Sequence, residues 1–335
     1  MSNIAVMGGG AWGTALALNL AQRGGHSVSL WTHSPAVAET IRAVGENTAF
    51  FPGVPLPPSI AATSNAGEAL GDADIILSVM PSHHVRDSFA LFAPHLNNKQ
   101  IIVSATKGIE DQTGMRISEV IEDALAAHDL RIHIAVLSGP SFAQEVAAGS
   151  PTAVTIASRD LAAATRIQHE FAGPTLRLYT NEDVIGVELG GALKNVIAIA
   201  AGAVSGLALG HNSTAALVTR GIAEITRLAV ACGGRRETLA GLSGLGDLVL
   251  TCTGSLSRNR WVGVELGKGR GLSEALAGLH GKVAEGVLTT SAALELARRH
   301  DVEMPITEQV HAILYHGKHP REAIQDLMGR PGRDE

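Results

Sequence analysis

The chain of 335 residues is long enough for about two domains, and 45% of its residues are apolar, so it can bury a sizeable core. Its formal net charge is −6 and it has no lysine and arginine run interleaved with aromatics, which argues against nucleic acid as a partner. Cys232 and Cys252 fit neither a disulfide framework nor metal-ligand spacing. The cysteine pattern therefore predicts no structural metal. No basic region precedes the first apolar run, which indicates a strand rather than a secretory signal, and we expect a cytoplasmic protein.

The first part of the chain predicts alternating strands and helices. Residues 4–7 form a short apolar run, residues 15–22 form an apolar-rich segment that ends at two glycines, and residues 28–31 form a second run. This unit of about 30 residues has the size of a right-handed βαβ crossover. Further strand candidates, mostly separated by helical segments, lie at 75–79, 101–104, 134–137 and 152–156. The pattern predicts a doubly wound parallel sheet.

A glycine-rich turn follows the first predicted strand directly. Gly8, Gly10 and Gly13 fit the G-x-G-x-x-G pattern, with Ala11 and Trp12 between the last two. The first glycine permits the tight turn, the second lets the backbone approach a pyrophosphate, and the third allows close contact between helix and strand. Because the turn lies between a strand and a helix, it predicts binding of a dinucleotide at the helix N-terminus.

The end of the second predicted strand bears on the choice of cofactor. NAD-preferring proteins place an acidic residue there to bind the ribose 2′-hydroxyl, and residues 30–34 contain none. A carboxylate would repel a 2′-phosphate, so its absence permits NADP(H), and His33 or Ser34 could bind that phosphate. NADP(H) is favoured, use of NAD(H) as well stays open, and His33 could instead be an ordinary solvated histidine of a turn.

From about Asp183 onward, long segments with helical spacing replace the short β-rich runs. We therefore expect a dinucleotide-binding domain over 1–182, an all-helical domain over 183–330 and a polar tail over 331–335. The apolar stretch 189–209 contains Lys194, Asn195 and glycines, which suits a buried helix better than a membrane span.

Two lysines have unusually small or apolar neighbours. Lys107 follows a predicted strand, and Lys194 lies inside the apolar helix, where a lysine costs free energy unless it has a partner. Desolvation lowers the pKa of a lysine, which would allow Lys194 to transfer a proton near neutral pH. The alternative is a structural lysine held in an ion pair.

Two further stretches are candidates for the substrate pocket. Residues 254–260 combine small polar donors with two guanidiniums in a segment that we expect to be a loop, which suits a phosphate but also fits a solvated basic loop. Asp247, among glycines, could orient a lysine, bind a hydroxyl or cap the next helix.

Several short motifs together match the pattern of one protein family. In order along nearly the whole chain, the segments are 8–14, 105–108, 138–143, 190–195, 244–248, 257–260, 283–286 and 303–306. Together they resemble the bacterial NAD(P)-dependent glycerol-3-phosphate dehydrogenases. Two residues depart from the family pattern: Ala11 stands where serine is common, and Thr214 stands where a basic residue is common. Neither departure removes a catalytic group.

The resemblance implies a Rossmann domain joined to an all-helical domain of the 6-phosphogluconate dehydrogenase type. It implies that Lys194 is the catalytic acid/base, with Lys107 and Asp247 assisting. The residues implied to contact the substrate are Lys107, Gly139, Ser141, Lys194, Asn195, Asp247, Thr251, Ser257 and Arg258. Those implied to bind the cofactor are Gly8, Gly10, Ala11, Trp12, Gly13, His33, Lys107, Ala143, Arg258, Asn259, Val283 and Glu285.

The implied reaction is the reversible reduction of dihydroxyacetone phosphate to sn-glycerol 3-phosphate, which supplies the backbone of phospholipids. The hypothesis has hydride reaching C2 of the ketone while Lys194 protonates the developing alkoxide and Lys107 stabilises its charge. No metal is needed, and a homodimer is one arrangement to consider. The rivals are a related dehydrogenase of hydroxy or keto acids and a dinucleotide sensor without catalysis.

Overall fold

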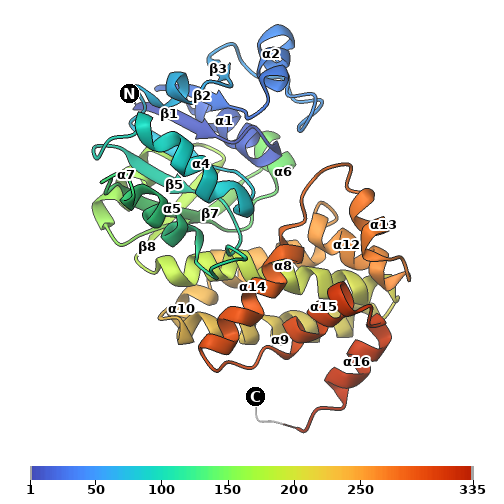
Figure 1. Cartoon of the computed structure of the whole chain (residues 1–335). Helices are drawn as coiled ribbons and strands as arrows, with labels where there is room; N and C mark the ends of the chain where they lie inside the picture. Colours follow the sequence, from blue (N-terminus) through green and yellow to red (C-terminus); the bar gives the residue numbers. More distant parts are fainter. Residues whose placement is uncertain (1, 333–335) are drawn as a thin grey trace. The chain divides into compact units, whose positions relative to one another are not determined.

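The computed structural model describes residues 2–332, so the last three residues of the predicted polar tail lie outside the described part of the chain. The chain divides into two compact units. The first runs to Lys107 and resumes over Arg116–Val187; the second comprises Gly108–Met115 and the chain from Glu188 onward. Figure 1 shows the sheet and the helices, coloured along the sequence. The chain therefore leaves the first unit after Lys107, returns at Arg116 and leaves again inside a helix.

The first unit is built on an eight-stranded sheet of order β3-β2-β1-β4-β5-β6-β7-β8. Neighbouring strands pair in parallel, except that β6 and β7 are antiparallel. The predicted Rossmann fold is confirmed, with this one antiparallel pair as a correction to the all-parallel expectation. The strands are β1 Ser2–Met7, β2 His26–Trp31, β3 Ile60–Thr63, β4 Ile75–Ser78, β5 Ile101–Ser104, β6 His133–Ser138, β7 Thr152–Ser158 and β8 Leu176–Asn181.

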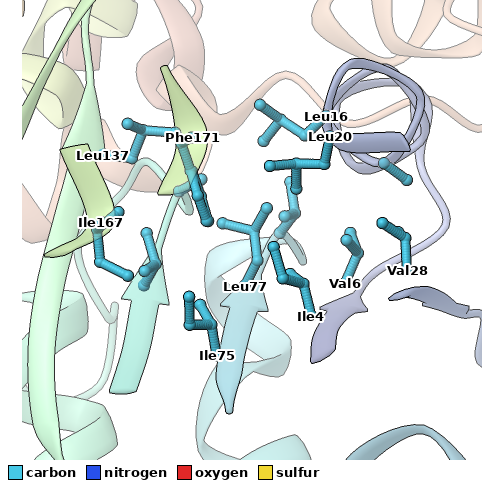
Figure 2. Packing of buried hydrophobic residues seen from close by; sticks show 14 of the residues in the cluster. Ile4, Val6, Leu16, Leu20, Val28, Ile75, Leu77, Leu137, Ile167 and Phe171 are labelled. Carbon is cyan, nitrogen blue, oxygen red and sulfur yellow. The ribbon is translucent and has the colours of Figure 1, made fainter. Parts of the chain in front are cut away.

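Helices connect these strands. They are α1 Ala11–Arg23, α2 Pro35–Val44, α3 Ala66–Leu70, α4 Val85–Phe92, α5 Ile117–Ala126, α6 Ala143–Ala147 and α7 Leu161–Phe171, with short 3-10 turns at Ser82–His84 and Ala93–His95. In Figure 2, Leu16 and Leu20 of α1 point towards Val6 and Leu77 of the strands, and Ile167 and Phe171 of α7 lie near Leu137. Aliphatic side chains thus fill the space between helices and sheet, as the low aromatic content of 3% requires.

The described part of the second unit from Glu188 onward is built from helices and the turns that join them. Its elements are α8 Val184–Gly206, which begins in the first unit, α9 Gly210–Ala231, α10 Arg236–Leu239, a π-helical turn Leu242–Gly246, α11 Asp247–Thr253, α12 Arg258–Gly267, α13 Leu272–Ala277, α14 Glu285–Arg299, α15 Pro305–His316 and α16 Pro320–Met328. By length and composition α8 could span a membrane, but 89% of its most apolar window is buried inside the protein, as the core helix of a soluble protein would be.

One segment expected to be a loop is partly helical. Ser257 is the N-cap of α12, because its Oγ accepts a hydrogen bond from the backbone N–H of Arg260 at 3.1 Å. Arg258, Asn259 and Arg260 therefore lie on the first turn of a helix instead of in a solvated loop. The basic side chains consequently start from a fixed backbone.

Candidate active site

The predicted site residues fall into two groups, one in each unit, and the first group begins at the turn between β1 and α1. Gly8 has a φ of +138°, and a Cβ there would lie 2.4 Å from the carbonyl oxygen of Val79. A Cβ on Gly13 would lie 1.9 Å from the carbonyl oxygen of Gly8. At Gly10, the N-cap of α1, nothing lies within 4 Å of the corresponding position. The turn is tight where it packs and open where a pyrophosphate would approach, so it fits a dinucleotide.

A buried side chain that the sequence did not reveal supports this turn. Asn47 is fully buried, and its Nδ2 donates to the carbonyl oxygen of Gly9 at 2.7 Å and to Oγ1 of Thr14 at 2.8 Å. It therefore links the backbone before Gly10 to the side chain of Thr14 on the first turns of α1. No motif marks Asn47, since its partners are close only after the chain has folded.

The end of β2 presents no carboxylate. Trp31 is buried at the last position of the strand, and His33 is exposed two residues later. Thr32 donates from Oγ1 to the carbonyl oxygen of Ser34 at 2.7 Å, which orders the turn before α2. The imidazole of His33 is therefore accessible where an NAD-specific protein would carry its acidic residue.

Lys107 lies just beyond the carboxyl end of β5. Its Nζ donates to the carbonyl oxygen of Gly139 at 3.2 Å, and Ser141 donates to the same oxygen at 3.0 Å. Gly139 and Ser141 follow β6 directly, and Ala143 is the first residue of α6. Lys107, Gly139 and Ser141 thus gather at the carboxyl edge of two neighbouring strands, where ligands of open α/β sheets bind.

In the second unit Lys194 lies on α8 with only 6% of its surface exposed. Its Nζ donates to Oδ1 of Asp247 and, at 2.8 Å, to Oγ1 of Thr251, both on α11. Asp247 and Thr251 are buried as well. The carboxylate of Asp247 therefore contacts the lysine and does not cap α11, whose N-cap is Gly246.

Glycines bring α8 and this turn together. A Cβ on Gly190 would lie 2.7 Å from the carbonyl oxygen of Ser243, and one on Gly244 would lie 2.1 Å from that of Leu239. The π-helical turn Leu242–Gly246 can thus approach α8 closely enough for Asp247 to reach Lys194. Near this cluster, burial raises the pKa of the Cys252 thiol to about 12, so Cys252 stays protonated and is not a nucleophile.

Asn195 and Asn259 form the next part of the group. Asn259 donates from Nδ2 to Oδ1 of Asn195 at 3.0 Å, and its Oδ1 accepts a hydrogen bond from the backbone N–H of Gly286 at 2.9 Å. Arg258, one residue earlier, keeps part of its surface exposed. Desolvation by the surrounding protein lowers the pKa of Arg258, and the carboxylate of Glu285 opposes this shift. Because arginine titrates so high, the guanidinium remains a cation that can bind a phosphate.

The family models identify the chain. The model described as "NAD-dependent glycerol-3-phosphate dehydrogenase N-terminus" matches residues 3–164, and the C-terminus model of the same family matches residues 183–325. The chain belongs to the NAD-dependent glycerol-3-phosphate dehydrogenase family. The resemblance found in the sequence motifs is therefore confirmed, and the protein is an oxidoreductase with NAD(P) as its cofactor.

Relatives within this glycerol-3-phosphate dehydrogenase family cover the whole chain. A protein of Acidobacterium capsulatum named glycerol-3-phosphate dehydrogenase [NAD(P)+] is 67% identical, with 100% of both chains covered. One of the same name from Koribacter versatilis is 60% identical over 100% of this chain and 99% of its own. The crystal structure of glycerol-3-phosphate dehydrogenase from Coxiella burnetii is 41% identical, with a TM-score of 0.93 over 98% of this chain and 99% of its own.

The described residues also bear on metals. Across residues 2–332, no group of three or more His, Cys, Asp or Glu side chains lies in an arrangement that could hold a metal ion. The polar groups that the structure does gather in the second unit are an amine, a carboxylate, a hydroxyl, amides and a guanidinium. These groups suit proton transfer and the binding of an anion.

Proposed function

We propose that the protein reduces dihydroxyacetone phosphate to sn-glycerol 3-phosphate, with Lys194 as the general acid. The observation that carries this proposal is the buried contact of Lys194 with Asp247 and Thr251. A lysine is rarely buried without a partner, and here the partner is a carboxylate that keeps the ammonium in one place. Family membership supplies the reaction class.

The cofactor would be held in the first unit by the turn at Gly8, Gly10 and Gly13, with His33 at the end of β2. When bound in its reduced form, it supplies a hydride. Ala11 and Trp12 begin α1 beside the turn, and Ala143 begins α6. In the second unit Arg258, Asn259, Val283 and Glu285 are the remaining residues proposed to bind it. NADP(H) is favoured because no carboxylate follows β2.

The residues of the chain then act on the ketone. The Lys194 ammonium donates a proton to the oxygen on C2 as negative charge develops there. The Asp247 carboxylate accepts from a different N–H of the same ammonium and so fixes its orientation. The Lys107 ammonium stabilises the same developing charge. Arg258, with the hydroxyl of Ser257 close by on the chain, anchors the phosphate, so binding at the unreactive end positions the carbonyl.

The remaining substrate contacts are proposed on the same basis. Gly139 and Ser141 lie at the carboxyl end of β6 beside the Lys107 ammonium. Asn195 follows Lys194 on α8, and Oγ1 of Thr251 accepts a hydrogen bond from the Lys194 ammonium. Family resemblance carries the rest of the proposal. The physiological direction would be reduction, for phospholipid synthesis, and the protein would be a cytoplasmic homodimer.

Consumption of reduced cofactor tests the function. NADPH and NADH are each offered with dihydroxyacetone phosphate and with unphosphorylated dihydroxyacetone, and absorbance of the reduced nicotinamide is followed. We expect turnover with the phosphate ester alone. Turnover of hydroxy or keto acids instead would favour the rival dehydrogenase, and cofactor binding without any turnover would favour the sensor.

A lysine variant tests the role of Lys194. Lys194→Ala should lower kcat by about 10²–10⁴-fold, the range typical of a lost general acid. Lys99→Ala is the matched control, because Lys99 is an exposed lysine outside both groups of site residues. If Lys194→Ala and Lys99→Ala retained the same kcat, Lys194 could not be the general acid.

A further inference from the structure

The segment Gly108–Met115 leaves the sheet-containing unit immediately after Lys107 and belongs to the helical unit. Two backbone hydrogen bonds close it on itself. The N–H of Gly114 donates to the carbonyl oxygen of Glu110 at 2.8 Å, and the N–H of Glu110 donates to the carbonyl oxygen of Met115 at 3.0 Å. Thr113 donates from Oγ1 to Oε2 of Glu110 at 2.5 Å. The segment is therefore an ordered turn, and we call it the 108–115 loop.

Arg299, the last residue of α14, attaches this loop to the helical unit. Its Nη1 donates to the carbonyl oxygen of Thr113 at 2.7 Å, although 186 residues separate the two in sequence. A Cβ on Gly114, whose φ is +72°, would lie 3.2 Å from the same Nη1. Arg299 is held in turn by Glu295 on its own helix, with Nε and Oε1 3.3 Å apart. The guanidinium thus bridges its helix and the loop.

Lys107 lies between two attachments. On its N-terminal side, Thr106 donates from Oγ1 to the carbonyl oxygen of Met80 at 3.0 Å, which ties the chain to the segment after β4. On its C-terminal side, Gly108 begins the loop that Arg299 holds. The backbone of Lys107 is therefore defined from both directions, and its side chain is only half-buried. Loss of either attachment would widen the range of positions open to the Lys107 ammonium.

We propose that Arg299 is a positioning residue that sets the Lys107 ammonium for reaction by fixing the 108–115 loop. The inference rests on the proposed function, in which Lys107 stabilises the charge that develops on the substrate. Arg299 itself would touch neither substrate nor cofactor. Its effect on turnover passes through the backbone of Lys107.

Arg298 provides a matched control on the same helix end. It pairs with the same carboxylate as Arg299, with Nη1 and Oε2 of Glu295 3.5 Å apart, and its side chain is 74% exposed. Within the described residues, Arg298 has no recorded hydrogen bond or ion pair with the 108–115 loop. Arg298→Ala and Arg299→Ala therefore remove the same charge beside the same partner, and only the second releases the loop.

The test compares these variants in two backgrounds. Arg299→Ala should lower kcat/KM for dihydroxyacetone phosphate about threefold to tenfold, the range expected for the loss of one ordinary hydrogen bond, while Arg298→Ala stays at the wild-type value. In a Lys107→Ala background Arg299→Ala should cause no further loss, because the residue through which it acts is gone. Arg299→Lys, which can still donate to Thr113, should restore part of the activity.

A second readout follows the loop directly. Hydrogen exchange of the peptide that contains residues 108–115 should become faster in Arg299→Ala and stay unchanged in Arg298→Ala. Two results would overturn the inference while leaving the proposed function intact. One is an unchanged kcat/KM in Arg299→Ala, and the other is an equal fold loss from Arg299→Ala in the wild-type and Lys107→Ala backgrounds. If the wild-type protein did not turn over dihydroxyacetone phosphate at all, the proposed function itself would fail, and this role of Arg299 would fail with it.

Discussion

Asn259 donates a hydrogen bond from Nδ2 to Oδ1 of Asn195, one residue after Lys194, at 3.0 Å. Its own Oδ1 accepts from the backbone N–H of Gly286 at 2.9 Å. A single buried amide therefore links α8, α12 and the start of α14. A Cβ on Gly286 would lie 2.6 Å from the carbonyl oxygen of Asn195, so the three helices meet with little space between them.

Asn259→Ala should lower the free energy of unfolding by about 1–3 kcal/mol, because it leaves the buried groups of Asn195 and Gly286 without their partner. Asn259→Asp keeps an acceptor for Gly286, but it turns a second acceptor towards Oδ1 of Asn195 and buries a charge, so it should cost at least as much. Urea unfolding of both variants measures the difference, and Asn212→Ala, at an exposed position on α9, serves as the control. An alanine variant as stable as wild type would show that this amide does not hold the helices together.

Glu224 caps a helix from a distance, and this makes stability depend on pH. Its carboxylate accepts from the backbone N–H groups of Ile306 and Thr307, each at 2.9 Å, and from Oγ1 of Thr307 at 2.7 Å, at the start of α15. Burial nevertheless raises the pKa of Glu224 above its usual 4.5, and the hydrogen bonds offset this only in part. The folded protein therefore binds this proton more tightly than the unfolded chain does.

We expect the contribution of Glu224 to the free energy of unfolding to fall as pH rises from about 4.5 through its raised pKa, and to be constant above it. Glu224→Gln should remove this dependence. It should also cost about 1–3 kcal/mol where Glu224 is ionised, because the amide NH₂ turns a donor towards the N–H groups at the start of α15. Urea unfolding across this pH range checks both effects, and identical pH profiles for the two proteins would contradict the assignment.

Glycines let α8 and α12 cross at backbone contact. A Cβ on Gly263 would lie 1.9 Å from the carbonyl oxygen of Ile199, and one on Gly202 would lie 2.0 Å from that of Arg260. Gly263→Ala should lower the free energy of unfolding by about 1–3 kcal/mol or more, since overpacking outweighs the gain of about 1 kcal/mol in helix propensity. Gly271→Ala is the control, because nothing lies within 4 Å of its Cβ position. Equal melting temperatures for the two variants would mean that the helices can separate without cost.

The exposed His33 gives a test of cofactor choice. Replacing it by aspartate places a carboxylate at the end of β2, where it would repel a 2′-phosphate and accept from a ribose 2′-hydroxyl. His33→Asp should lower the ratio of kcat/KM for NADPH to that for NADH by about tenfold or more, which corresponds to about 1.4 kcal/mol. Parallel assays with the two cofactors measure the ratio. A ratio unchanged by the substitution would show that the 2′-phosphate is bound elsewhere.

The sheet strands found from the sequence are those with continuous buried runs, such as β4 and β5, because both faces of a central parallel strand are covered. The sequence did not reveal β3, Ile60–Thr63, which is short and contains two alanines, or β8, Leu176–Asn181, at the other edge. Edge strands carry weaker apolar patterns, since one long side lacks a neighbour. The antiparallel direction of β7 depends on which strand it meets, which no local pattern encodes.

The sequence by itself determined the family, the glycine turn and the lysines of interest, because these depend on residue type and spacing along the chain. Only the tertiary structure decided that Asp247 pairs with Lys194, that Asn47 supports the glycine turn, and that Arg299 holds the loop after Lys107. Each of these contacts joins segments far apart in the chain. Their partners are chosen by how the helices pack, and close approach at glycines such as Gly190 makes that packing possible.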